Sequence, residues 1–156
     1  INRGFGGSEI SDSVHYADRI VIPYQPDIIV FYAGGNDINA GKSAETVFDD
    51  FKQFVSTVRE KLPATKIAYI SVAPNPSRWA QMDRIVKANR LIRDYTTTER
   101  GLSFIDVHPD MLGPDGKPKP DIYQPDKLHM NPKGYAIWKR LVGEHLKTIG
   151  AQPVRR

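Results

Sequence analysis

Two side chains with complementary chemistry stand three residues apart in the tetrapeptide Asp126-Lys127-Leu128-His129. At this spacing within a turn, the carboxylate can accept a hydrogen bond from Nδ1 of the imidazole, so that Nε2 becomes available as a base. An acid in a serine-hydrolase triad does this work: it fixes the tautomer and direction of the imidazole and stabilises the imidazolium. The spacing therefore predicts an acid–base pair suited to acyl transfer.

Two glycine-containing segments upstream could supply hydrogen-bond donors to a developing oxyanion. Asn36 follows Gly34 and Gly35 directly after an apolar run, and its side-chain amide is one candidate donor. A backbone N–H from the glycine-rich stretch at 4–7 is the other. Each segment also has a plainer interpretation. Asn36 could bond its own backbone in a strand-to-helix turn, and the glycines could simply form a tight turn.

Apolar patterns predict three strands separated by helices. Short apolar runs predict buried strands at 28–33, 66–73 and 102–107. Helical spacing predicts a short helix capped by Ser8 or Ser11, and longer helices over 43–62, 79–100 and from the Asn131-Pro132 pair onward. This alternation predicts a three-layer α/β/α sandwich with a parallel sheet. Functional groups in such folds gather at the carboxyl ends of the strands, which favours Gly7, Asn36, the loop at 74–76 and the long loop at 108–130.

Composition narrows the class of protein. The 156 residues predict a single domain spanning 1–156. The absence of cysteine excludes disulfides and thiolate catalysis, and the net charge of +4 is spread along the chain. No apolar run is long enough to cross a bilayer, and no basic stripe indicates a nucleic-acid partner. The compartment is left open.

The other candidate groups have structural interpretations. His15 and His145 fall on predicted helices and are assigned packing or surface roles. A metal site from His108, His129 and nearby aspartates lacks the helical ligand spacing of zinc hydrolases, so neither metal nor cofactor is expected. Four apolar side chains could line an acyl or alcohol pocket, the helical ones being assigned to the core by default: Trp79, Tyr123, Met130 and Trp138.

Together, the segments at 2–8, 34–37 and 126–129 resemble the SGNH, or GDSL-type, hydrolase family, in the same order along the chain. The resemblance implies a flavodoxin-like SGNH hydrolase fold and ester hydrolysis without a cofactor. It also implies that Gly7 and Asn36 form the oxyanion hole and that Asp126 orients His129. Small carboxylic esters are the implied substrates, among them acetylated sugars, lysophospholipids and short-chain acyl esters.

The chain departs from this family in one respect, because nothing in it matches the Gly-Asp-Ser block that carries the nucleophile. The sequence opens at Ile1 in a glycine-rich stretch, and we expect the serine and the first two strands to lie upstream of it. The strand at 28–33 would then be an open apolar edge, covered by that segment, by a second chain or by another copy in a homo-oligomer. Neither Ser8 nor Ser71 follows a strand-to-helix elbow, so neither is expected to substitute. The alternative function is an inactive remnant that acts as a binding or assembly module.

Overall fold

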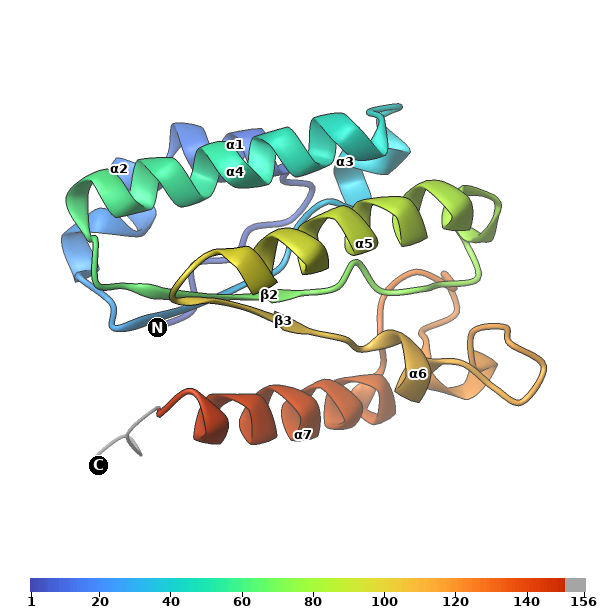
Figure 1. Cartoon of the computed structure of the whole chain (residues 1–156). Coiled ribbons are helices and arrows are strands. Elements are labelled where there is room, and N and C mark those ends of the chain that lie inside the picture. Colours follow the sequence, from blue (N-terminus) through green and yellow to red (C-terminus); the bar gives the residue numbers. More distant parts are fainter. Residues whose placement is uncertain (151–156) are drawn as a thin grey trace. The chain divides into compact units, whose positions relative to one another are not determined.

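The structure, a computed structural model, describes residues 1–150 and divides the chain into two compact units. The first unit comprises Ile1–Val72 and Ala80–Phe104, and the second comprises Ala73–Trp79 and the described residues from Ile105 onward. Figure 1 follows both units along the chain.

A parallel three-stranded sheet is the framework of the first unit. Its order is β1-β2-β3, with β1 spanning Ile28–Phe31, β2 Lys66–Ile70 and β3 Leu102–Ile105. In the β1–β2 pair, Ile28 lies opposite Lys66 and Phe31 opposite Tyr69. The middle strand β2 is buried from Ile67 to Ile70. The predicted parallel-sheet α/β fold is therefore confirmed.

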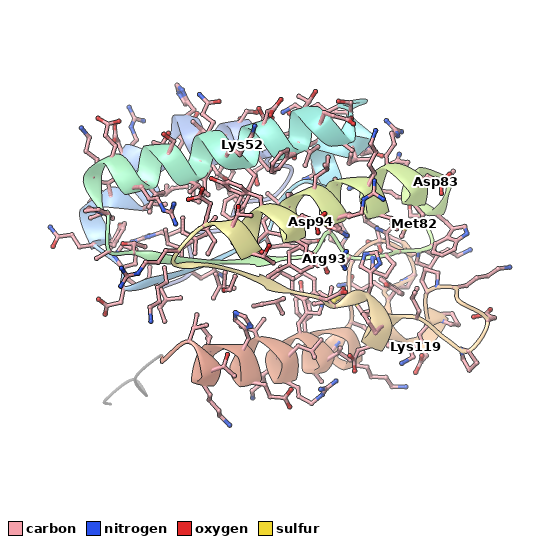
Figure 2. All side chains as sticks on the ribbon, in the orientation of Figure 1. Lys52, Met82, Asp83, Arg93, Asp94 and Lys119 are labelled. Atoms are coloured by element: carbon pink, nitrogen blue, oxygen red, sulfur yellow. The ribbon has the colours of Figure 1, made fainter. Side chains whose placement is uncertain are left out.

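The longest helices of this unit pack over one face of the sheet (Figure 1). Helix α4 spans Ala44–Lys61 and buries Phe51 and Phe54, while α5 spans Met82–Thr98. The Phe54 ring stacks on the Phe31 ring of β1 at 4.3 Å between centroids. Charged side chains such as Lys52 on α4 and Asp94 on α5 lie at the surface (Figure 2). The unit also contains α1 (Ile10–His15), α2 (Ala17–Ile20), η1 (Ile22–Tyr24) and α3 (Gly35–Asn39). Helix α4 begins as predicted, because the Ser43 side chain accepts a hydrogen bond from the Thr46 N–H.

Two predictions about the start of this unit were wrong. Neither Ser8 nor Ser11 caps the first helix: Glu9 is the N-cap, and its N–H donates to the Asp12 carboxylate at 2.8 Å. The Ser8 hydroxyl instead donates to the Phe5 carbonyl at 2.9 Å. The single short helix is also broken at Tyr16 into α1 and α2.

Strand β1 is not buried on both faces as its apolar run suggested. Val30 is 39% exposed and Tyr32, just beyond the strand, is 47% exposed, whereas Phe31 is buried. Successive side chains of a strand point to opposite faces of the sheet: the Phe31 ring packs on Phe51 and Phe54 of α4, whereas Val30 and Tyr32 point to the other face. Alternate residues therefore face the helices and the surface.

The second unit is built around α7 (Pro132–Thr148). This helix begins as predicted, because the Asn131 side chain accepts hydrogen bonds from the N–H groups of Lys133 and Gly134. The long loop at 108–130 is more ordered than expected. It contains α6 (His108–Met111), η3 (Pro120–Ile122) and isolated bridges at Leu112–Pro118 and Tyr123–Met130. η2 (Trp79–Gln81) spans the junction of the units. Within residues 1–150, no helix is both long and apolar enough to cross a membrane.

Candidate active site

The second unit brings together the predicted acid and base. Nδ1 of His129 lies 2.7 Å from Oδ2 of Asp126, and both side chains are exposed to solvent. The other carboxylate oxygen, Oδ1, accepts the backbone N–H groups of Leu128 and His129, each at 2.9 Å. Hydrogen bonding from His129, followed by these two backbone donors, lowers the pKa of Asp126 to about 2. The carboxylate is therefore ionised throughout the neutral range, and its bond to Nδ1 directs Nε2 away from it.

The turn that carries this pair is tied at its base. The backbone N–H of Gln124 donates to the His129 carbonyl at 2.7 Å, and the Lys127 N–H donates to the Gln124 carbonyl at 2.9 Å. Lys127 adopts a left-handed conformation with φ of 59°, which turns the chain so that residues 126 and 129 meet. The Tyr123 hydroxyl donates to the Pro74 carbonyl within the same unit. The acid–base geometry thus rests on backbone bonds that a three-residue spacing does not reveal.

The first unit brings together the two predicted oxyanion segments, although they are 28 residues apart. The Asn36 side-chain amide donates to the Ser8 carbonyl at 3.0 Å. Gly7, the residue before Ser8, has φ of 75° and is exposed. Asn36 lies in α3, just beyond the carboxyl end of β1. This contact therefore differs from the plainer interpretation, in which the Asn36 side chain bonds only its own local backbone.

The turn between β1 and α3 is shaped by a glycine and a tyrosine. Gly34 has φ of 111°, and a Cβ on it would lie 2.9 Å from Cγ2 of Val72. The fully buried Tyr69 donates its hydroxyl hydrogen to the Ala33 carbonyl at 2.7 Å, which holds the end of β1. Burial raises the pKa of Tyr69 well above its usual value, so this hydroxyl keeps its hydrogen. Sequence patterns alone did not assign Tyr69 to the site.

An ion network around the buried carboxylate next to Asn36 was also missed. Asp37 is completely buried, and its carboxylate accepts the Ile10 N–H and the Lys42 ammonium. Lys42 also contacts the carboxylates of Glu9 at 2.9 Å and Asp50 at 2.7 Å. The only sequence signal was an aspartate next to a candidate donor, followed five residues later by a lysine.

The other serines and histidines considered from the sequence belong neither to the acid–base pair nor to the oxyanion segments. Ser71 is fully buried, and Ser8 is engaged with Phe5. His15 is exposed on α1, while burial lowers the pKa of His145 on α7. Among residues 1–150, no cluster of three or more histidine, aspartate or glutamate side chains could hold a metal ion.

The predicted pocket-lining residues have varied environments. Tyr123 is buried, and Trp79 is 37% exposed. Met130 pairs with Tyr123 in an isolated bridge, and the Trp138 indole N–H donates to the Met111 sulfur at 3.2 Å.

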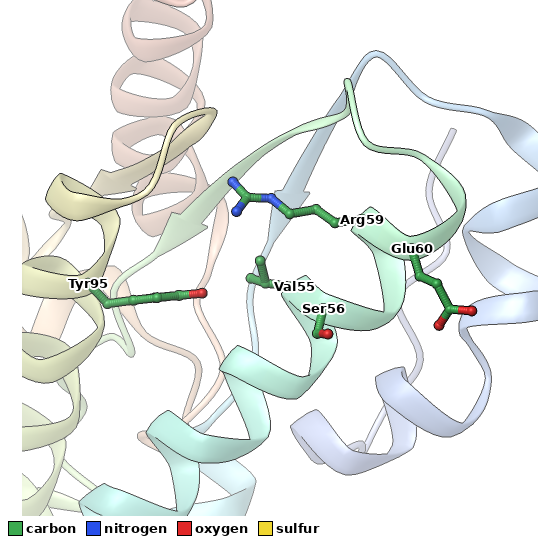
Figure 3. A pocket seen from close by; sticks show the side chains of 5 residues that line it. All are labelled: Val55, Ser56, Arg59, Glu60 and Tyr95. Carbon is green, nitrogen blue, oxygen red and sulfur yellow. The ribbon is translucent and has the colours of Figure 1, made fainter.

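A pocket of about 420 Å³ lies elsewhere in the first unit, between the last turns of α4 and α5. Arg59 and Tyr95 reach towards it from the two helices (Figure 3), and Val55, Ser56 and Glu60 complete its wall. Because α4 ends where the chain enters β2, this pocket lies by the amino ends of the strands, opposite to Asn36. None of the predicted site residues lines it.

Comparison with known proteins identifies a family match. The family described as GDSL-like lipase/acylhydrolase matches residues 1–137. The platelet-activating factor acetylhydrolase IB subunit alpha1 of Pongo abelii is 30% identical over 159 residues, covering 97% of this chain and 65% of the relative. The chain thus spans less than two thirds of this curated relative.

Solved structures share the fold. A GDSL-like lipase from Bacteroides thetaiotaomicron superposes with a TM-score of 0.79 at 22% identity, covering 96% of this chain and 76% of that one. A carbohydrate esterase of family 3 from Talaromyces cellulolyticus gives a TM-score of 0.79 at 20% identity, covering 94% and 70%. At these identities the likeness concerns the fold alone.

Proposed function

Since the chain belongs to the GDSL-like lipase/acylhydrolase family, we propose that it carries the acid, the base and the oxyanion donors of a serine ester hydrolase. The observation that carries this proposal is the 2.7 Å contact between Asp126 and Nδ1 of His129, made by a carboxylate whose pKa is about 2. A permanently ionised acid bonded to one imidazole nitrogen is the arrangement that makes the other nitrogen a general base.

In the proposed reaction, the nucleophile is a serine in a segment outside these 156 residues. His129 Nε2 takes the hydroxyl proton as the serine oxygen bonds to the ester carbonyl carbon. The Gly7 N–H and the Asn36 amide stabilise the negative charge that develops on the carbonyl oxygen. His129 then gives the proton to the departing alcohol as the ester C–O bond breaks. A water deprotonated by His129 then attacks the acyl carbon, and His129 returns the proton to the serine oxygen as its bond to the acyl carbon breaks and the carboxylic acid leaves.

We propose small carboxylic esters as substrates, with acetyl esters as the first to test. The names of two relatives support this class: one is a platelet-activating factor acetylhydrolase subunit and the other a carbohydrate esterase. Acetylated sugars, lysophospholipids and short-chain acyl esters all fall within it. This mechanism requires no metal or cofactor.

We further propose that the segment carrying the serine covers the edge of β1, with a second copy of the chain as the alternative occupant. Within residues 1–150, β1 pairs with β2 alone and leaves Val30 and Tyr32 exposed next to its open side. An unpaired apolar edge is a site for strand addition. The greater length of the curated relative is consistent with an additional segment.

The test is hydrolysis of p-nitrophenyl acetate by the protein with all its encoded residues. We expect His129→Ala to lower kcat/KM by about three powers of ten or more, because the general base is lost. His15→Ala is the matched control, since His15 is an exposed histidine on α1, and it should retain activity within about twofold. Equal activity of wild type and His129→Ala would overturn the assignment.

The rival function is an inactive module for binding or assembly. One observation favours it: Ser8 and Ser71, the serines considered as substitutes, are engaged or buried. Intact mass and N-terminal sequencing of the purified protein, together with the assay above, separate the two. An encoded upstream Gly-Asp-Ser with His129-dependent turnover supports the enzyme. Absence of both supports the module.

A further inference from the structure

We propose that Asp37, paired with Lys42, is a positioning residue that sets both proposed oxyanion donors in place. This inference rests on the proposed function and goes beyond it, because Asp37 itself would touch neither substrate nor nucleophile. Asp37 follows Asn36 directly and is completely buried. A fully buried carboxylate is costly unless it is paired and hydrogen-bonded, so its position indicates a specific structural task.

The task is visible in two parallel contacts between segments that are distant in sequence. The Asn36 amide donates to the Ser8 carbonyl at 3.0 Å. The Ile10 N–H donates to both carboxylate oxygens of Asp37, at 3.1 and 3.2 Å. Two consecutive side chains of α3 thus clamp two backbone groups of the 8–10 segment.

The clamp governs the direction of the Gly7 N–H, since Gly7 is joined directly to the clamped segment. A Cβ built on Gly7 would meet no atom within 4 Å, so packing around the residue does not fix it. Its backbone also has φ of 75°, a region in which glycine has wide freedom. Apart from the bond from the Ser8 hydroxyl to the Phe5 carbonyl, which spans Gly7, the bonds to Asn36 and Asp37 are therefore the restraints that follow immediately along the chain. Donors to an oxyanion lose much of their effect when displaced by a fraction of an ångström.

Lys42 makes this clamp electrostatically possible. Its ammonium lies 3.0 Å from Oδ1 of Asp37 and also pairs with Glu9 and Asp50. Partial burial lowers the pKa of Lys42, but hydrogen bonds to Asp50, Glu9 and Asp37 outweigh it and raise the pKa above its usual value. The lysine therefore stays charged and gives the buried carboxylate an ionic partner, which it shares with Glu9 and Asp50.

The first experiment is independent of catalysis. In ¹⁵N-labelled protein with all its encoded residues, Asp37→Asn should shift or broaden the NMR signals of the Gly7 N–H and the Asn36 side-chain NH₂. Lys42→Met should do the same, and it decides the question if Asp37→Asn does not fold. Asp50→Asn is the control, because it removes another carboxylate from Lys42 but leaves the contacts of Ile10 and Ser8. If the Gly7 and Asn36 signals respond to Asp50→Asn as strongly as to the other two variants, the inference is wrong.

The second experiment asks whether Asp37 acts through Asn36. We expect Asp37→Asn to lower kcat for p-nitrophenyl acetate about tenfold, with KM within about twofold. Removal of an oxyanion donor costs about two to three powers of ten in rate, and displacement of a donor should cost only part of this. In the Asn36→Ala background the same change should cost clearly less, about threefold, since one of the two donors that Asp37 positions is already absent and only the Gly7 N–H remains. Full multiplication of the two losses would instead indicate a merely structural role and overturn the inference. Lack of turnover in the wild type would count against the proposed function, and the NMR comparison would still decide the role of Asp37.

Discussion

The Asp126 carboxylate accepts three hydrogen bonds within one four-residue turn while its side chain is 45% exposed. Exposure to water normally leaves a carboxyl near its usual pKa, so the depression to about 2 comes from bonding to the charged form. The His129 contact is the largest cause, and the two backbone N–H groups follow.

A direct titration tests this account at the level of the residue. We expect the side-chain carboxyl carbon of Asp126 to titrate near pH 2 in ¹³C NMR. In His129→Ala the pKa should rise towards the usual value of about 3.9 without reaching it, because the backbone donors remain. An unchanged pKa in His129→Ala would contradict the assignment of His129 as the main cause.

The same shift has a defined sign for stability. The folded pKa of Asp126 is depressed, so the unfolded chain binds more protons between the two pKa values. Its contribution to stability is thus present above pH 3.8 and is lost as the pH falls towards 2.

The residues that were predictable from sequence are those whose partners are local. Asp126 and His129 are three positions apart, so their spacing alone suggested the contact. Asp37 contacts Ile10, which is 27 residues away, and its burial depends on how α1 and α3 are placed. Long-range partners of this kind leave no periodic signal.

At the scale of elements, α5 supports the carboxyl end of β2 through one buried side chain. The Asn89 amide group accepts the Val72 N–H at 2.8 Å and donates to the Val72 carbonyl at 3.0 Å. Val72 lies two residues beyond the end of β2, where the regular strand pairing has stopped. Asn89 therefore provides buried hydrogen-bond partners for both the N–H and the carbonyl of Val72.

Truncation of Asn89 should be costly. We expect Asn89→Ala to lower the free energy of unfolding by about 2–4 kcal/mol, because both groups of Val72 lose a buried partner. Arg90→Ala, an exposed neighbour on the same helix, should change it by less than about 0.5 kcal/mol. Urea denaturation measures both, and equal stability of the two variants would show that Asn89 is dispensable.

Helix boundaries illustrate which elements the sequence could predict. The starts of α4 and α7 follow from Ser43 and Asn131, whose side chains bond the first turn of their own helices. The start of α1 could not be predicted in this way, because its N-cap is Glu9, not one of the residues that usually cap helices, and its backbone N–H donates to the Asp12 carboxylate. The short helix α6 was not predicted either. It lies in a loop that is ordered by hydrogen bonds between its own residues, such as the bond from the Lys119 N–H to the Met111 carbonyl.

At the scale of the whole molecule, the notable feature of the fold is that β1, within residues 1–150, has a strand partner at one of its two edges only. The strand was expected to be an edge from the family resemblance, and the sheet order β1-β2-β3 is in accord with this. Composition and periodicity alone suggested burial on both faces, because an apolar run does not reveal whether other elements cover each face of the strand.

Hydrogen exchange tests whether that side is covered in the active protein. We expect the amides of Ile28–Phe31 to exchange about as slowly as those of Lys66–Ile70, because a covering strand would pair them on both sides. The β2 amides are an internal control from the same sheet. Exchange in β1 that is faster by about two powers of ten would show that the edge stays open.

The division of the chain also separates its indole chromophores. Trp79 and Trp138, the two tryptophans of the sequence, both belong to the unit with Asp126 and His129. The unit with Gly7 and Asn36 has nine phenylalanine and tyrosine rings in its aromatic contacts but no tryptophan. Emission excited in the indole band therefore comes from residues of the acid–base unit, with Trp79 in η2 at the junction of the units along the chain. The other unit has to be followed by its tyrosine absorption or by a label placed there.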